Sequence, residues 1–216
     1  MTSRDPEIPF AAEFAATLEY LFAMRRDIRG FRPDPLPEHA LEQLLAIACL
    51  APSVGLSQPW RFVIVDTPAR RARLRDIFAA CNAEALAACD PERAPLYATL
   101  KLAGLDEAPA QVSVFVDRAA GAGHGLGRQT MPETADYSVV MAIHTLWLAA
   151  RARGIGVGWV SILDPILVRA ALDVPDHWHL IGHLCIGYPR RSDDTPELAR
   201  RGWEHRQPAA SFILRR

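Results

Sequence analysis

The chain has 216 residues, of which half are hydrophobic and 23% are charged, and its net charge is -1. This composition is typical of one folded domain and excludes a largely disordered chain. No basic field is present that would attract nucleic acid or an anionic membrane, so any anion must be bound locally. We expect a single domain over residues 1–216, with a short N-terminal extension (1–12) and a C-terminal arm (about 192–216).

Neither a secretory signal nor a membrane span is predicted. No basic region followed by an apolar run opens the chain, and the most apolar stretch, 137–150, is too short and too interrupted to cross a bilayer. The four cysteines are scattered and form no Cys-x-x-Cys pair, which favours buried or idle thiols. These features predict a cytoplasmic protein.

Helices and strands are predicted in an interspersed order. Apolar spacing predicts helices over residues 11–28, 38–51, 67–89, 94–105, 133–153 and 165–172. Apolar runs predict strands over residues 61–66, 111–117, 156–163 and 180–187. Because the elements do not alternate as strict strand–helix–strand units, we expect an α+β fold with a mixed central sheet flanked by helices.

The first predicted helix ends in Arg25-Arg26-Asp27-Ile28-Arg29. Arg25 and Arg29, four residues apart, would project from one helix face, and guanidinium groups match phosphate oxygens bidentately. A phosphorylated ligand is the specific hypothesis, and a solvated basic helix end is the alternative. Asp27 is unfavourable near a helix C-terminus, which suggests a chemical role, and the neighbouring cations should lower its pKa.

Two further segments hold candidate binding residues. In the loop 51–60, Gly55 permits close backbone approach to a ligand and Ser53 offers a hydroxyl, although a simple turn explains the loop equally well. The run Gly-x-Gly-x-Gly at 154–158 follows a helix rather than a strand, so it is not a dinucleotide fingerprint. Ser161 near the end of the strand 156–163 occupies a usual place for an active-site group.

The Gly-rich loop 118–132 is long for a compact domain and is a candidate lid. The helix 133–153 is apolar on all sides, since Val139 and Ile143 follow one stripe while Val140 and Leu148 lie elsewhere. Such a helix must be buried all round, which favours cover by a partner subunit.

Three histidines, His177, His179 and His183, raise the possibility of a metal site. His179 and His183 should share one side of a strand, but no carboxylate or cysteine joins them at ligand spacing. We therefore expect no metal.

These segments together resemble the nitroreductase-like flavoprotein superfamily, and within it the members that consume their flavin. The resemblance covers roughly residues 15–206. It is carried by Arg25-Arg26-x-x-Arg29-x-Phe31 with Asp27 inside it, Ala-Pro-Ser-Val-Gly-x-x-Gln-Pro-Trp at 51–60, Leu100-Lys101-Leu102-x-Gly104, Leu126-Gly127-Arg128, the helix segment 146–152, and Gly156-Val157-Gly158-Trp159-Val160-Ser161-Ile162.

The resemblance implies a homodimer with FMN at the subunit interface. It implies that the FMN phosphate is held by Arg25, Arg26, Arg29 and Arg191. The other FMN-binding residues that it implies are Asp27, Ile28, Ser53, Gly55, Lys101, Gly158 and Ser161. Asp27 matches a catalytic acid/base and Ser161 a catalytic serine, and the low pKa expected for Asp27 favours a proton relay between them.

The implied reaction breaks reduced FMN apart with dioxygen, giving 5,6-dimethylbenzimidazole, the lower ligand of cobalamin, and erythrose 4-phosphate. A separate flavin reductase would supply the reduced FMN. One alternative is an NAD(P)H-dependent FMN nitroreductase, which keeps its flavin. Another is a non-catalytic flavin-binding carrier, against which Asp27 argues because a passive phosphate clamp gains nothing from a neighbouring carboxylate.

Overall fold

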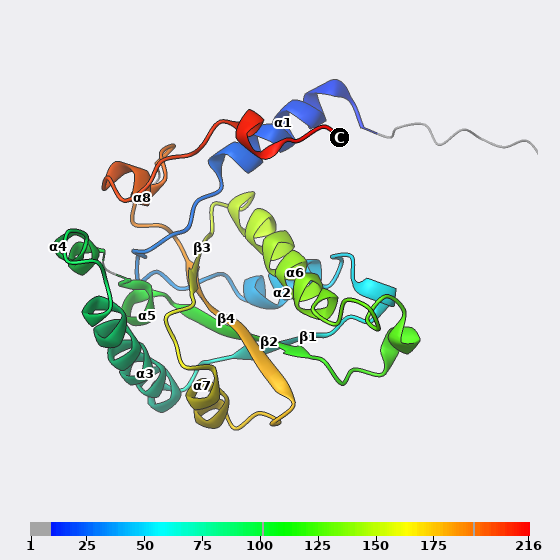
Figure 1. Cartoon of the computed structure of the whole chain (residues 1–216), viewed down its shortest axis with the longest axis horizontal. Coiled ribbons are helices and arrows are strands. Elements are labelled where there is room, and N and C mark those ends of the chain that lie inside the picture. The colour runs from blue at the N-terminus through cyan, green and yellow to red at the C-terminus, as the bar shows by residue number, and fades with distance from the viewer. Residues whose placement is uncertain (1–9, 101, 192) are drawn as a thin grey trace, which may run out of the picture.

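The structure, a computed structural model, describes residues 10–100, 102–191 and 193–216. Its centre is a four-stranded sheet in the order β1-β2-β4-β3 (Figure 1). The strands are β1 (Trp60–Ile64), β2 (Ala110–Asp117), β3 (Gly156–Val160) and β4 (Trp178–Gly187). The helices are α1 (Ala12–Met24), α2 (Ala40–Ala48), α3 (Pro68–Ala87), α4 (Ala94–Thr99), α5 (Gly104–Glu107), α6 (Thr134–Arg151), α7 (Pro165–Leu172) and α8 (Glu197–Arg200). Short 3-10 turns are η1 (Val54–Leu56), η2 (Ala122–Gly125) and η3 (Ala209–Phe212).

The predicted α+β class is confirmed, but the sheet is less mixed than expected. All three strand pairs are antiparallel. Among the described residues, the one parallel link is an isolated bridge between Asp27 and Val157 of β3. Parallel character is therefore limited to the place where the segment after α1 meets the free edge of β3.

Helices cover both faces of the sheet and create two cores. On one face, α2 and α6 pack against Val112, Val114 and Val116 of β2. On the other face, α3, α5 and α7 pack against residues that include Phe115 of the same strand (Figure 1). The period-two alternation of strand side chains thus gives β2 a buried residue at almost every position.

The predicted elements are largely present with shifted ends. The helix over 165–172 has the predicted bounds, whereas the single helix expected over 94–105 is two short helices, α4 and α5. The prediction that His179 and His183 share one side of a strand is wrong. The pairing of β2 with β4 shifts at Ile181, and this extra residue reverses the alternation, so that His183 is buried while His179 is exposed.

His183 belongs to a buried network of polar side chains that β2 and β4 contribute. Its Nδ1 lies 2.8 Å from Ser113 Oγ and its Nε2 lies 3.2 Å from Gln111 Oε1. The Gln111 amide nitrogen donates to the Leu105 carbonyl at 2.9 Å, so Oε1 faces the ring and accepts from a protonated Nε2. Burial lowers the pKa of His183 from 6.5 to about 3, and the imidazole is neutral in the folded chain.

This network predicts a loss of stability in mild acid. The folded pKa is depressed, so the unfolded chain takes up the extra proton as the pH falls below 6.5, and the stability declines until the pH reaches the folded pKa. We expect the free energy of unfolding to be lower by about 1.4 kcal/mol at pH 5.5 than at pH 7.5 from this group. Urea denaturation at both pH values measures it.

The pH effect should be reduced in His183→Gln, which can still accept from Ser113 and donate to Gln111. The exposed His39 provides the control, His39→Gln, which should keep the pH dependence of the parent. An undiminished pH dependence in His183→Gln would contradict the assignment.

None of the helices in the described part of the chain is long and apolar enough to cross a membrane. Nor does any group of three or more His, Cys, Asp or Glu in this part have a metal-binding arrangement.

Candidate functional site

The candidate phosphate segment is an extended strap rather than a helix end. Helix α1 stops at Met24, and Arg25 already has extended backbone angles (φ -69°, ψ 131°). The amide of Ile28 donates to the Val157 carbonyl at 3.0 Å, at the free edge of β3. The expectation that Arg25 and Arg29 lie on one helix face is therefore wrong, because pairing with β3 satisfies the backbone in place of a helical turn. We call residues 25–31 the strap.

Two glycines of β3 allow the strap to lie against the strand. A Cβ at Gly158 would come within 2.1 Å of the Ile28 carbonyl oxygen, and one at Gly156 within 2.7 Å of the Ile28 side chain. The space in which a side chain at Gly158 would lie is thus filled by backbone of the strap. Gly158 contributes to the site by placing Asp27, the neighbour of Ile28.

Replacing Gly158 with alanine should displace the strap. The overlap is with backbone, which cannot swing aside as a side chain does, so we expect a loss of about 1–3 kcal/mol in unfolding free energy and weaker ligand binding. Urea denaturation measures the first effect. Gly121→Ala is the matched control, since nothing lies within 4 Å of its Cβ position, and an equal response of the two variants would contradict this role.

Asp27 is held at the edge of β3 by one hydrogen bond and one ion pair. Its Oδ1 accepts from the Trp159 backbone amide at 2.9 Å, and its Oδ2 lies 3.7 Å from Arg29 Nε. Burial raises the pKa of Asp27 above its ordinary value of 3.8, and outweighs the Trp159 hydrogen bond and the charges of Arg29 and Arg25, which lower it. The expected lowering of this pKa is therefore wrong. An ionised carboxylate here is a stronger base than the sequence suggested.

The arginines near Asp27 also make other contacts. The Arg25 guanidinium lies 4.8 Å from the centre of the Trp147 ring, a cation–π contact. Arg26 donates to the carbonyls of Ala23 and Arg25 at 2.6 and 2.7 Å and also to the Asp194 carbonyl. Burial and the neighbouring Arg206 lower the pKa of both Arg25 and Arg26.

A cavity of about 270 Å³ opens beside the strap and is covered by the segment around α8. Its lining brings together six arginines and three acids: Arg26, Arg29, Arg190, Arg191, Arg200, Arg201, Asp27, Asp193 and Glu197. Such a guanidinium-rich surface fits a phosphate group, because several planar donor groups can share its oxygens. Of the four arginines expected to hold a phosphate, Arg26, Arg29 and Arg191 line this cavity and Arg25 does not.

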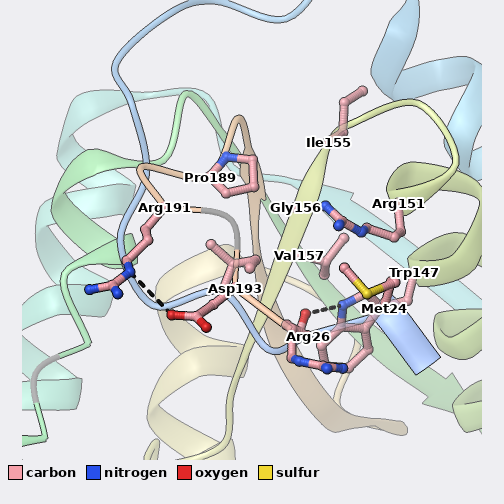
Figure 2. A pocket seen from close by; sticks show the side chains of 11 residues that line it. Met24, Arg26, Trp147, Arg151, Ile155, Gly156, Val157, Pro189, Arg191 and Asp193 are labelled. Carbon is pink, nitrogen blue, oxygen red and sulfur yellow. Dashed lines mark hydrogen bonds and ion pairs between the residues drawn. The ribbon is translucent and has the colours of Figure 1, made fainter. Parts of the chain in front are cut away.

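Figure 2 shows the neighbouring small pocket, which shares Arg26, Arg191 and Asp193 with this cavity. The Trp147 indole nitrogen donates to the Arg26 carbonyl at 3.0 Å, and Arg191 and Asp193 face one another. Trp147 therefore joins helix α6 to the strap.

Ser161 follows directly on the end of β3 and is exposed. It lies two residues beyond Trp159, and strand geometry places it about 7 Å along the same edge from the amide that binds Asp27. A ligand lying on this edge could reach both side chains. Lys101 lies outside the described residues.

Ser53 and Gly55 belong to a different part of the chain's surface. Their loop is tied to α6 through Ser138, whose Oγ accepts from the Val54 amide at 3.0 Å. The strap is tied to the same helix through Trp147, nine residues and about 13 Å further along its axis. In Figure 1 the loop, in cyan, and the strap lie on opposite sides of α6.

The loop 118–132 packs on the Ser53–Gly55 loop. Gly55 has a positive φ of 56°, and its Cβ position lies about 3 Å from the carbonyls of Gly123 and Leu126. The close backbone approach predicted for Gly55 is thus made to this loop. Its role as a lid stays a prediction.

Several residues at the site were missed from the sequence. Trp147 lies in the helix that the sequence predicts over 133–153, and its apolar surroundings there give no sign of its contacts with the strap. Asp193, Glu197 and Arg200 lie in a polar arm without periodicity, where no motif marks them as part of a cavity.

The comparison with protein families identifies the class to which this fold and site belong. The model described as "Nitroreductase family" matches residues 22–188, and the chain belongs to this family. The matched range includes the strap, the sheet and the loop 51–60.

The curated relatives of this chain include proteins named 5,6-dimethylbenzimidazole synthase. One from Rhodospirillum rubrum is 60% identical over 92% of this chain and 94% of the relative, and one from Rhodobacter capsulatus is 52% identical over 85% and 89%. A solved structure of iodotyrosine deiodinase bound to FMN and 3-iodo-L-tyrosine has a TM-score of 0.73 at 23% identity, and the match covers 92% of this chain and 97% of that one. At this identity the deiodinase supports the fold alone.

Proposed function

We propose that this chain is a 5,6-dimethylbenzimidazole synthase, an oxidoreductase that fragments reduced FMN with dioxygen. The observation that carries the proposal is Asp27, a carboxylate of raised pKa fixed between an arginine-lined cavity and the edge of β3. The identity of 60% to a relative of this name over nearly the whole chain supports the same activity.

Reduced FMN is the substrate, and its atoms account for the products. The dimethylated ring with its two nitrogens takes one ribityl carbon to become the benzimidazole. The remaining four ribityl carbons leave with the phosphate as erythrose 4-phosphate, and the pyrimidine end leaves as a third fragment that carries oxygen. Dioxygen is the oxidant.

The protein's part is to hold the phosphate, orient the ribityl chain and move protons. Arg26, Arg29 and Arg191 would bind the phosphate in the cavity. Asp27 directly follows Arg26 and precedes Arg29 by two residues. It would then lie close to the ribityl chain, where a carboxylate can take a proton from carbon. Ser161, on the same edge of β3, would accept or return that proton.

A homodimer would complete the site. The loop of Ser53 and Gly55 is attached to α6 about 13 Å along the helix axis from the point where the strap is attached. A second copy of the chain could therefore bring this loop to a flavin that is bound at the strap of the first copy. Supporting this, large apolar side chains are exposed on α1, on α6 and near the C-terminus, namely Phe14, Tyr20, Phe22, Tyr137, Val140, Met141, Phe212, Ile213 and Leu214. In the view of Figure 1, α1 and the C-terminal segment are both drawn above α6. Exposed apolar area of this kind marks an interface.

A separate flavin reductase would supply reduced FMN, since the proposed reaction consumes the flavin instead of recycling it. A cytoplasmic location is consistent with the four free cysteines. Burial raises the pKa of the Cys185 thiol to about 12, which makes it unreactive.

The test is to mix the purified protein with chemically reduced FMN in air and follow the flavin absorbance. We expect the chromophore to be lost. An NAD(P)H-dependent nitroreductase would return oxidised FMN, and a carrier would give the same spectrum as buffer. Either of these outcomes would contradict the proposal.

A further inference from the structure

Asp193 neutralises two arginines of the cavity through a single oxygen. Its Oδ2 lies 3.1 Å from Arg191 Nε and 3.1 Å from Arg200 Nε, and its side chain is only 21% exposed. Figure 2 shows the Arg191 contact as a dashed line. A carboxylate therefore stands where a negatively charged ligand would bind these arginines.

The other cations of the cavity have separate partners. Arg29 is paired with Asp27, Arg201 with Glu197, and Arg190 with Glu107, which lies outside the cavity lining. Arg26 is bound to main-chain carbonyls. Arg191 and Arg200 thus share one acid, and they are the pair whose partner a phosphate can replace with the least loss of other contacts.

The segment that carries Asp193 is anchored at two places that follow it in the chain. Arg26 donates to the Asp194 carbonyl, so the backbone is fixed next to the carboxylate. Further along, Trp203 packs against Tyr97 of α4 and beneath the Arg93 guanidinium. With the main chain held in this way, displacement of Asp193 needs a side-chain rotation and no opening of the arm.

We propose that Asp193 competes with the ligand's phosphate for Arg191 and Arg200, and so keeps these two arginines neutralised until a phosphate monoester displaces its carboxylate. The inference rests on the proposed function, because it assigns the phosphate to this cavity. A phosphate monoester carries nearly two negative charges and three acceptor oxygens, enough to replace one carboxylate at two guanidinium groups. A ligand without that group leaves Asp193 in place.

The test is to compare binding of oxidised FMN, which is not consumed, with binding of riboflavin by quenching of flavin fluorescence. Asp193→Asn should bind FMN more tightly, by roughly ten-fold, because the competing charge is gone, whereas riboflavin affinity should not change. Asp176→Asn, which removes a carboxylate that is 98% exposed and paired with Arg169, is the matched control and should leave both affinities at the parent values.

Weaker or equal FMN binding by Asp193→Asn would overturn the inference, since it would mean that Asp193 orients the arginines instead of competing for them. Inorganic phosphate, titrated by calorimetry, gives an independent result. If the chain failed to bind FMN while Asp193→Asn bound phosphate more tightly than the parent, the competition would stand and the proposed function would fail.

Discussion

Asp27→Asn should slow formation of the benzimidazole by orders of magnitude while FMN still binds. The asparagine Oδ1 can accept the Trp159 amide hydrogen bond as the carboxylate does, so the strap should keep its place on β3. What is lost is the proton acceptor, and general-base catalysis contributes about 10²–10⁴-fold to rates. Product formation from reduced FMN in air, measured by chromatography, should fall by that factor.

The pH dependence of the parent enzyme provides a second measurement of the same group. Burial raises the pKa of Asp27, so a larger fraction of the carboxyl stays protonated as the pH falls, and protonated carboxyl cannot act as a base. We expect the acid limb of kcat/KM to lie above the ordinary carboxyl value of about 3.8 and activity to rise with pH through it.

An exposed acid provides the control for Asp27→Asn. Asp34 is 55% exposed and pairs with Arg32 beyond the strap, so Asp34→Asn should retain the parent rate and the parent acid limb. Normal turnover by Asp27→Asn would refute the role assigned to this carboxylate.

Arg29→Ala should weaken FMN binding by about 10- to 150-fold, the effect of losing a hydrogen bond to a charged group. Arg29 lines the cavity, and its side chain is only 16% exposed, so its guanidinium interacts with an anion under reduced screening by solvent. Arg29→Lys should lie between the parent and the alanine variant, because lysine keeps the charge and loses the planar fork. Fluorescence titration with oxidised FMN measures all three.

Arg32→Ala is the matched control for this series. Arg32 is 52% exposed, stacks on Tyr188 and lies outside the cavity lining. Its removal should leave FMN affinity unchanged. If Arg32→Ala and Arg29→Ala weakened binding equally, the effect would come from net charge, and the phosphate would not be held in this cavity.

Much of the fold follows from the apolar pattern. The helical spacing of apolar residues in α6 and the unbroken apolar segments in β2 and β4 each predict one buried element from its own residues alone. The bulge at Ile181 could not be predicted in this way, because it depends on how two distant strands pair. It alone changes which histidine enters the core.

The site was predictable as a set of residues but not as a conformation. The motif around Asp27 predicts phosphate chemistry, yet helical spacing continued past Met24 and placed two arginines on a shared face. The structure shows a strap, since the free edge of β3 and the small volumes of Gly156 and Gly158 favour an extended partner there. That pairing is tertiary, and so is the burial that raises the pKa of Asp27.

The central claim is that this chain consumes FMN, and the most direct measurement is the stoichiometry of a completed reaction. Reduced FMN is incubated with the purified protein in air, and the flavin, benzimidazole and tetrose phosphate are quantified by mass spectrometry. We predict one 5,6-dimethylbenzimidazole and one erythrose 4-phosphate for each FMN lost. Full recovery of oxidised FMN with neither product would contradict the claim.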